Sequence, residues 1–271
     1  MISLFKSKPL VDEASSSWLF DAFGWAIQQF DGQFFADKSQ LILPTNEFFP
    51  NRANSVEELA TSVFDNVSGY CGLTKWPFKL VDPQQYVPQQ YQVTQPLLIV
   101  RGDNPEAGEG HNQLQTQQDQ LTVSYDPVQL NQPQVMVANY AAMLSSYLMG
   151  LSSQLPPGGE EHRAPAIEVL SIFMGFGVMF ANTAYAFRGG CASCHDHRAN
   201  RTAVLTENES IYALAMFCLL KDIDNKTVTP HLKKHLRGMY KQAVKQIQGQ
   251  SEDLENLRIM TSAHTLSLSA S

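Results

Sequence analysis

Residues 135–150 carry apolar side chains at spacings of three and four, which predicts an amphipathic helix. Pro133 stands just before this stretch, where the first turn of a helix tolerates proline. After the loop LPPGGEEHR, residues 165–187 are apolar on nearly every side, which predicts a second helix that is buried all round. We therefore expect two consecutive helices at the centre of the fold, entered from a strand at 121–125.

The first half of the chain mixes helix and strand signals. Residues 16–30 carry an apolar stripe that is typical of a helix. Ser55 and Glu58 form the capping-box pattern that opens another helix, which should end near Tyr70. Four short apolar runs predict strands, namely QLILP (40–44), FKLVD (78–82), PLLIV (96–100) and LTVSY (121–125). A small mixed sheet with helices, followed by a mainly helical half, is an α+β arrangement.

Two further helices are signalled near the C-terminus. Thr206 as N-cap and Glu209 three residues later predict a helix over IYALAMFCLL. Pro230 predicts the start of another, HLKKHLRGMYKQAVKQIQ, and the serine-rich end HTLSLSAS is expected to fray. We expect an N-terminal α/β subdomain over 1–131 and a helical subdomain over 132–271, together forming one compact domain.

Composition indicates a globular protein rather than a disordered one. The chain has 271 residues, 44% of them apolar and 17% charged. Its net charge of −7 argues against a general nucleic-acid binder. No apolar signal-peptide core follows the N-terminus, and four cysteines in a chain of this size do not indicate a disulfide framework, so we expect a cytoplasmic protein.

One stretch is long enough to cross a membrane, because residues 169–187 carry no formal charge. Ser171, Gly175 and Asn182 interrupt it, and no second stretch is comparable. We therefore predict a buried core helix and no membrane span. The sequence also lacks the G-x-S-x-G elbow, the P-loop and the Rossmann glycine pattern, and the tripeptide RGD at 101–103 carries no weight because any loop can contain it.

Five segments, spread over most of the chain, resemble a group of uncharacterised bacterial proteins with the zincin metallopeptidase fold, in its gluzincin branch. These segments are ILPTNEFFPNR (42–52), LTVSYDPVQL (121–130), VANYAAMLSSYL (137–148), IFMGFGVMFANTAYAF (172–187) and LTENESIYALAMF (205–217). In that family the first central helix carries H-E-x-x-H, with two zinc ligands and the general base. The second carries E-x-x-x-D, whose Glu is the third ligand and whose Asp braces a histidine.

The resemblance implies that the metal site is degenerate in this chain. The first ligand position falls on Ala142, the base on Met143, the second ligand on Ser146 and the third on Ala164, while Glu168 alone keeps a carboxylate. Alanine has no donor atom, and a thioether takes no proton near neutral pH. We therefore expect a zincin-like protein without catalysis that binds a protein or peptide. An enzyme of another class that uses the vacated cleft remains the alternative.

The sharpest remaining pattern is a C-x-x-C-H run with a further histidine, formed by Cys191, Cys194, His195 and His197. Three interpretations stay open. The run could hold a structural zinc through its thiolates and a histidine. It could attach a c-type haem, which would require export of the chain. It could also be a loop without a ligand. Zinc is the cofactor that this run favours, with haem and a loop without a ligand as the open alternatives.

His231 and His235 could form a second ligand pair one turn apart on the predicted C-terminal helix. Lysines stand between them, which disfavours a zincin-type metal site because a lysine cannot be the general base. The helix collects basic side chains, namely Lys233, Lys234, Arg237, Lys241 and Lys245. We interpret them as a solvated face, and an acidic partner is the alternative.

A last titratable cluster, Glu160, Glu161 and His162, lies between the two central helices. Glu161 could pair with Glu168. No nucleophile or base geometry follows from the pair, and an exposed loop is the expected outcome.

Overall fold

The computed structural model describes residues 8–50, 54–82, 84–86, 92–93, 99–102, 114–115, 121–152, 154–184 and 201–267. The fold is mostly helical with short strands, in agreement with the predicted α+β class. Its first half contains α1 (Glu13–Gln29), α2 (Gly32–Asp37), α3 (Val56–Tyr70), β1 (Phe78–Val81), β2 (Gln92–Val93), β3 (Leu114–Gln115), β4 (Leu121–Ser124) and the 3₁₀ turn η2 (Pro127–Asn131).

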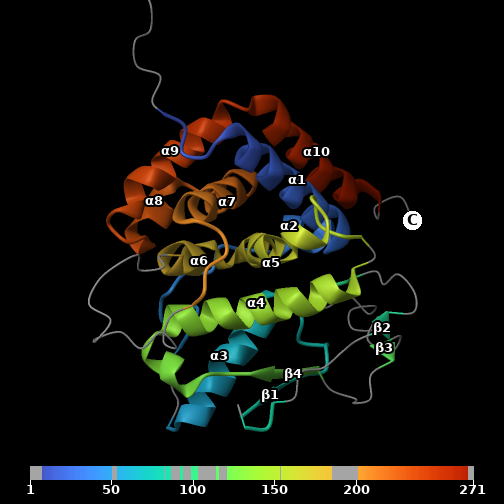
Figure 1. The fold of residues 1–271 in the computed structure, drawn as a ribbon, viewed down its shortest axis with the longest axis vertical. Coiled ribbons are helices and arrows are strands. Elements are labelled where there is room, and N and C mark those ends of the chain that lie inside the picture. The colour runs from blue at the N-terminus through green and yellow to red at the C-terminus, as the bar shows by residue number, and fades with distance from the viewer. Residues whose placement is uncertain are drawn as a thin grey trace, which may run out of the picture.

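The second half begins with a central helical hairpin (Figure 1). Its first arm is α4 (Pro133–Leu151), and the second arm is built from η3 (Glu160–His162), α5 (Arg163–Ser171), the π-turn η4 (Ile172–Phe176) and α6 (Gly177–Thr183). The chain then continues through α7 (Glu207–Leu220), α8 (Asn225–Val228), η6 (Thr229–His231), α9 (Leu236–Gln248) and α10 (Ser251–Ser267). The two predicted central helices are thus confirmed.

Two hydrogen bonds fix the register of the hairpin. Ser145 Oγ lies 2.8 Å from Ser171 Oγ, and Asn182 Nδ2 donates to Gln134 Oε1 at 2.8 Å. In both pairs the residue numbers add to the same value, as expected for antiparallel helices without a slip. The hairpin therefore has a loop end near Leu151 and an open end near Pro133, where α6 finishes beside the start of α4.

The arm α5–η4–α6 is apolar all round because helices cover it on several sides. It packs against α4 on one side and against α1 and α7 on others, and in Figure 1 it lies between them. The stretch Glu160–Thr183 is long and apolar enough to cross a membrane, and 83% of its most apolar window is buried within the protein. A core helix passes the same test, and the packing supports that interpretation.

Two ladders of two strands replace the predicted single sheet in the described residues. β1 pairs with β4 in parallel, and β2 pairs with β3 antiparallel. The predicted strands at 78–82 and 121–125 are confirmed. The predicted strand at 40–44 is wrong, because that segment joins no ladder and Ile42 N–H donates instead to the Gly175 carbonyl at 3.0 Å. Of the predicted strand at 96–100 only Ile99 and Val100 are described, and they are not in a strand.

Local capping signals are largely confirmed. Thr206 Oγ1 accepts from Glu209 N–H at 3.2 Å while the Glu209 carboxylate accepts from Thr206 N–H at 2.9 Å, which completes a capping box. At α3, Ser55 Oγ accepts from Glu58 N–H as predicted. The Glu58 carboxylate, however, accepts from Asn54 N–H rather than from Ser55, so this second box is only half formed.

The C-terminal boundaries differ from the prediction. Pro230 lies in η6, and α9 begins only at Leu236, so His231 and His235 do not share a helix. The chain from Ser251 to Ser267 is a helix, α10, which the sequence did not predict. The segment expected to fray, HTLSLSAS, is helical as far as Ser267, and the rest of it lies outside the described residues. α1 packs against α5, α7 and α10, and the Gln246 carboxamide of α9 accepts from Leu10 N–H at 2.7 Å. The N-terminal helix thus lies among the C-terminal ones.

Arg101 joins the N-terminal segments to the core. Its side chain is buried above the ring of Phe34, and its backbone N–H donates to Asp31 Oδ2 at 2.8 Å. Burial lowers the pKa of the Arg101 guanidinium to about 10, while Asp31 and Cys71 oppose the shift. A buried arginine cannot present the RGD tripeptide to a receptor.

Candidate binding pocket

The positions that the resemblance assigns to a degenerate site lie on α4 and α5. Ser146 and Ala164 are exposed, and Ala142 and Met143 are half-buried against the core. The side chain of α4 that meets α5 at this level is Ser145, through its hydrogen bond to Ser171. The expected cleft over Ala142 and Ser146 stays a prediction.

Glu168 is buried, and it has a structural partner. Its carboxylate forms an ion pair with Arg201 and accepts from the backbone N–H groups of Val204 and Leu205, both at 3.0 Å. The Arg201 guanidinium also lies 4.4 Å from the centroid of the Phe180 ring. Burial lowers the pKa of Arg201, and the charge of Glu168 opposes that shift. Glu168 thus holds the segment from Arg201 to Leu205 against α5.

The other titratable candidates have separate surroundings where the structure describes them. Cys191, Cys194, His195 and His197 lie outside the described residues. Glu161 is exposed, as expected, whereas Glu168 is buried, and Glu160 pairs with Arg163 at 2.6 Å. His235 lies 3.0 Å from Glu207. Among the described residues no group of three or more His, Cys, Asp or Glu side chains could hold a metal.

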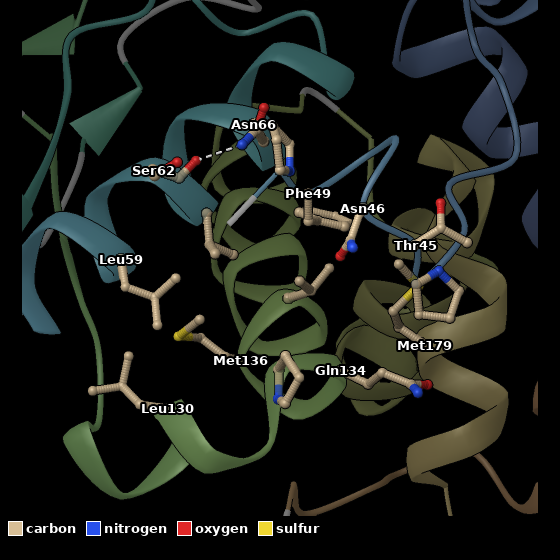
Figure 2. A pocket seen from close by; sticks show the side chains of 15 residues that line it. Thr45, Asn46, Phe49, Leu59, Ser62, Asn66, Leu130, Gln134, Met136 and Met179 are labelled. Carbon is tan, nitrogen blue, oxygen red and sulfur yellow. Dashed lines mark hydrogen bonds between the residues drawn. The ribbon is translucent and has the colours of Figure 1, made fainter. Parts of the chain in front are cut away.

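A pocket lies instead at the open end of the hairpin (Figure 2). It has a volume of about 290 Å³, and we call it the amide-lined pocket. The segment 44–50, α3, η2, α4 and α6 contribute its walls. Its lining consists of Pro44, Thr45, Asn46, Phe49, Pro50, Leu59, Ser62, Val63, Asn66, Leu130, Pro133, Gln134, Met136, Val137 and Met179.

A break in the central helix brings the segment 44–50 to this place. At η4 the helix opens into a π-turn, and Gly175 has a φ of 107° that favours glycine. The Gly175 carbonyl then accepts from Ile42 N–H, and a Cβ at Gly175 would run into the carbonyl oxygen of Gln40. The close crossing directs the chain to Pro44 and Thr45, next to Met179 one turn further along α6.

Aromatic contacts hold the same segment against α3. Tyr70 Oη donates to the Phe48 carbonyl at 2.7 Å. The rings of Phe48 and Phe49 lie edge-on to the Tyr70 ring, with centroids 5.7 and 6.0 Å away. Burial raises the pKa of the Tyr70 hydroxyl, and the neighbouring charge of Glu47 raises it further, so this group stays a hydrogen-bond donor. The wall of the pocket is therefore fixed at both ends.

The polar groups of the pocket keep free hydrogen-bonding capacity. Asn46 is exposed and its carboxamide has no partner among the described residues. Asn66 donates to the Ser62 carbonyl at 2.8 Å, which leaves its side-chain oxygen free, and Gln134 uses only its oxygen, for Asn182. The Thr45 hydroxyl is buried and unpaired. Figure 2 shows these groups together with the apolar side chains of Leu59, Met136 and Phe49, which also line the pocket.

The described lining of the pocket combines apolar and amide side chains. Among the described residues it contains no acidic, basic or histidine side chain and no cysteine. Such walls supply no general acid or base and no thiolate or carboxylate for a metal. They do supply apolar contact surface and amide groups that both donate and accept hydrogen bonds. The arrangement is suited to an uncharged ligand that carries both apolar and amide groups.

The sequence analysis quoted the segment ILPTNEFFPNR only as one of the five that carry the family resemblance, and it assigned no ligand to it. Sequence spacing could not connect this segment with Gln134 or Met179, because they are far apart in the chain. Comparison with protein-family models, with curated proteins and with solved structures gives no match.

Proposed function

We propose that this protein is a non-catalytic binding module whose ligand is an uncharged peptide segment. An apolar side chain of the peptide enters the amide-lined pocket, and the carboxamides of Asn46, Asn66 and Gln134 pair with its backbone. The observation that carries the proposal is the combination of apolar lining side chains with carboxamides that keep unpaired donor or acceptor groups, namely the whole carboxamide of Asn46, the side-chain oxygen of Asn66 and the side-chain nitrogen of Gln134.

The dimensions agree with a ligand of this kind. A volume of about 290 Å³ lies at the lower end of small-ligand pockets and accommodates one large side chain with part of its backbone. Burial of a Leu, Met or Phe side chain contributes about 1.5–3 kcal/mol. A peptide backbone offers N–H and C=O groups at alternating positions, which match the donor and acceptor ends of the carboxamides.

The resemblance to zincin-type proteins supports the same class of function, since it implies a binder that has lost its catalytic groups. The proposal places binding at the open end of the central hairpin instead of at Ala142 and Ser146. Neither place offers a complete set of zinc ligands. We therefore expect the protein to hold peptides without cleaving them.

Selection of peptides from a phage-displayed library, followed by fluorescence anisotropy on the selected sequences, tests the proposal. We expect uncharged peptides with a Leu, Met or Phe anchor. Leu59→Arg introduces a charge into the pocket and should reduce affinity more than tenfold, since an unpaired charge is costly beside apolar groups. Leu155→Arg is the matched control, because Leu155 is 56% exposed and lies elsewhere.

A milder pair of variants tests the amide contacts. Asn46→Ala removes a free carboxamide without disturbing the fold, and one lost hydrogen bond of about 1 kcal/mol should weaken binding roughly fivefold. Asn225→Ala, at an exposed asparagine on α8, should leave affinity unchanged. The proposal fails if no peptide is selected, or if the pocket variants bind the selected peptides as well as their controls do.

A further inference from the structure

Charge is unevenly distributed along this chain. Residues 225–250 contain six lysines and arginines and no Asp or Glu, namely Lys226, Lys233, Lys234, Arg237, Lys241 and Lys245. Because the whole chain has a net charge of −7, all the other residues together carry −13. One short stretch is thus strongly basic within an acidic protein.

The fold turns this stretch into a face. Arg237, Lys241 and Lys245 follow one another at intervals of four residues on α9, so they share one side of the helix, and all three are exposed. The opposite side is buried, mainly through Leu236, Tyr240, Ala243, Val244 and Ile247, and α9 packs on α7. Exposed Lys233 and Lys234 extend the face ahead of the helix. We call these five cations the α9 basic face.

The α9 basic face has one cation that is fixed by the backbone. Arg237 Nε donates to the Leu232 carbonyl at 3.0 Å, and its Nη2 donates to the Pro230 carbonyl at 3.2 Å. Within the described residues none of the five cations forms an ion pair with a carboxylate. Their charges are therefore available to a partner, and the guanidinium is already oriented.

We propose that the α9 basic face is a docking surface for an acidic segment of another protein. Arg237 and Lys245 are eight residues apart, which corresponds to about 12 Å of helix. Acidic residues bound the face, with Glu207 beside His235, Asp224 before it, and Glu252 and Asp253 after it. A short segment with carboxylates one helical turn apart fits between these limits.

Two other anionic partners fit less well. A nucleic acid would extend its phosphates beyond the face onto the flanking carboxylates, which repel it. A membrane surface is held best when apolar side chains insert beside the cations. The large apolar side chains that are exposed among the described residues, Val56, Leu155, Val204 and Ile259, all lie outside 225–250.

The surface is separate from the amide-lined pocket. In Figure 1, α9 and α3 lie on opposite sides of the central hairpin. The inference is therefore independent of the proposed peptide function, and each can fail without the other.

Fluorescence anisotropy with a labelled helical peptide rich in glutamate, and with its glutamine counterpart, tests the inference. We expect the full-length protein to bind the glutamate peptide only, with an affinity that falls as salt is added. The double variant Lys241→Glu and Lys245→Glu should weaken binding roughly tenfold or more, because each attraction becomes a repulsion. The matched control, Lys38→Glu with Lys79→Glu, changes the net charge equally at exposed sites elsewhere and should retain affinity.

Competition identifies the partner class. Duplex DNA, single-stranded RNA and phosphatidylserine vesicles should displace the glutamate peptide poorly. The inference is overturned if the peptide does not bind, if both double variants lose affinity equally, or if a nucleic acid or the vesicles bind more tightly than the peptide.

Discussion

Gln134 and Ala142 lie about two turns apart on α4, yet their surroundings differ. Gln134 faces a pocket that four other segments help to form, whereas Ala142 is half-buried beside an exposed Ser146. The difference arises from the segment 40–50. It crosses the second arm at Gly175 and reaches only the open end of the hairpin. A cavity at one level of a helix thus depends on which other segments reach that level, and the sequence of the helix alone does not show it.

The largest effect is expected at the loop end. Glu168→Gln breaks a buried ion pair and leaves Arg201 without its counter-charge, which should lower the free energy of unfolding by about 3–5 kcal/mol. Glu161→Gln, at an exposed carboxylate, should change it by less than about 0.5 kcal/mol. Urea denaturation measures both. A near-neutral Glu168→Gln would mean that this carboxylate is a remnant of a site and not a structural anchor.

The π-turn η4 lies between the loop end and the open end of the hairpin. Gly175→Ala tests whether its close crossing with residues 40–42 stabilises the fold. The φ of 107° alone costs an alanine about 1–3 kcal/mol, and the contact with the Gln40 carbonyl adds to that loss. Gly150→Ala is the control, since a Cβ there meets no atom and helix propensity should add up to about 1 kcal/mol. If Gly175→Ala melts at the wild-type temperature, the crossing does not fix the pocket wall.

A pH series tests whether both sides of the hairpin unfold together. Burial raises the pKa of Cys71, at the end of α3, and that of Cys218, in α7, from 9.0 to about 12. Between pH 9 and 10 the unfolded state therefore loses thiol protons that the folded state keeps. Stability should fall in this window as pH rises, with a limiting slope of about 1.4 kcal/mol per pH unit for each thiol. The effect of the thiols should fade as pH drops below 9, because the unfolded thiols then stay protonated as well.

The single variants Cys71→Ala and Cys218→Ala should each remove the part of this slope that the substituted thiol contributes, in one common denaturation transition. Tyr140 and Tyr240, whose pKa values burial also raises, add a decline of the same sign as pH approaches 10 and should keep it in both variants. Two separate transitions, each sensitive to one cysteine, would show that the two sides are independent units. The measurement stops at pH 10 because the lowered pKa of Arg101, about 10, contributes with the opposite sign above that value.

The smallest effect concerns metal. The described residues that line the amide-lined pocket include no His, Cys, Asp or Glu, so a chelator should leave peptide affinity unchanged. Zinc analysis of protein purified without added metal separately tests the prediction for Cys191, Cys194, His195 and His197. About one equivalent of zinc supports a structural zinc there, and a Soret band supports haem. If neither is found, the interpretation as a loop without a ligand stands. A loss of peptide affinity with chelator would contradict the pocket assignment.

Local signals allowed much of the fold to be predicted. Thr206 with Glu209 predicts α7 because a capping box involves only neighbouring residues. The second arm of the hairpin is apolar on all sides, which predicts that it is buried.

The predictions that failed concern segments whose structure depends on distant partners or whose pattern is weak. Residues 40–44 look like a strand but give their backbone donor to Gly175, and α10 buries few apolar side chains, among them Leu254 and Leu257, so its periodicity is faint.

The site was harder to predict than the fold for the same reason. The amide-lined pocket combines Asn46, Asn66 and Gln134 from three segments, and a single sequence contains no signal that relates them. The resemblance directed attention to Ala142 and Ser146, because these residues fall on the ligand positions of the family motif. A cavity depends on packing between segments, which composition and spacing do not encode.

Hydrogen exchange on the protein, with and without a selected uncharged peptide, tests the central comparison most directly. We predict slower exchange in residues 44–50, in α3 around Leu59 to Asn66 and in the first two turns of α4, with no change from Ala142 to Ser146. Protection at Ala142 to Ser146 and at Ala164, with none at the open end, would contradict the account and return the binding site to the position that the family resemblance implies.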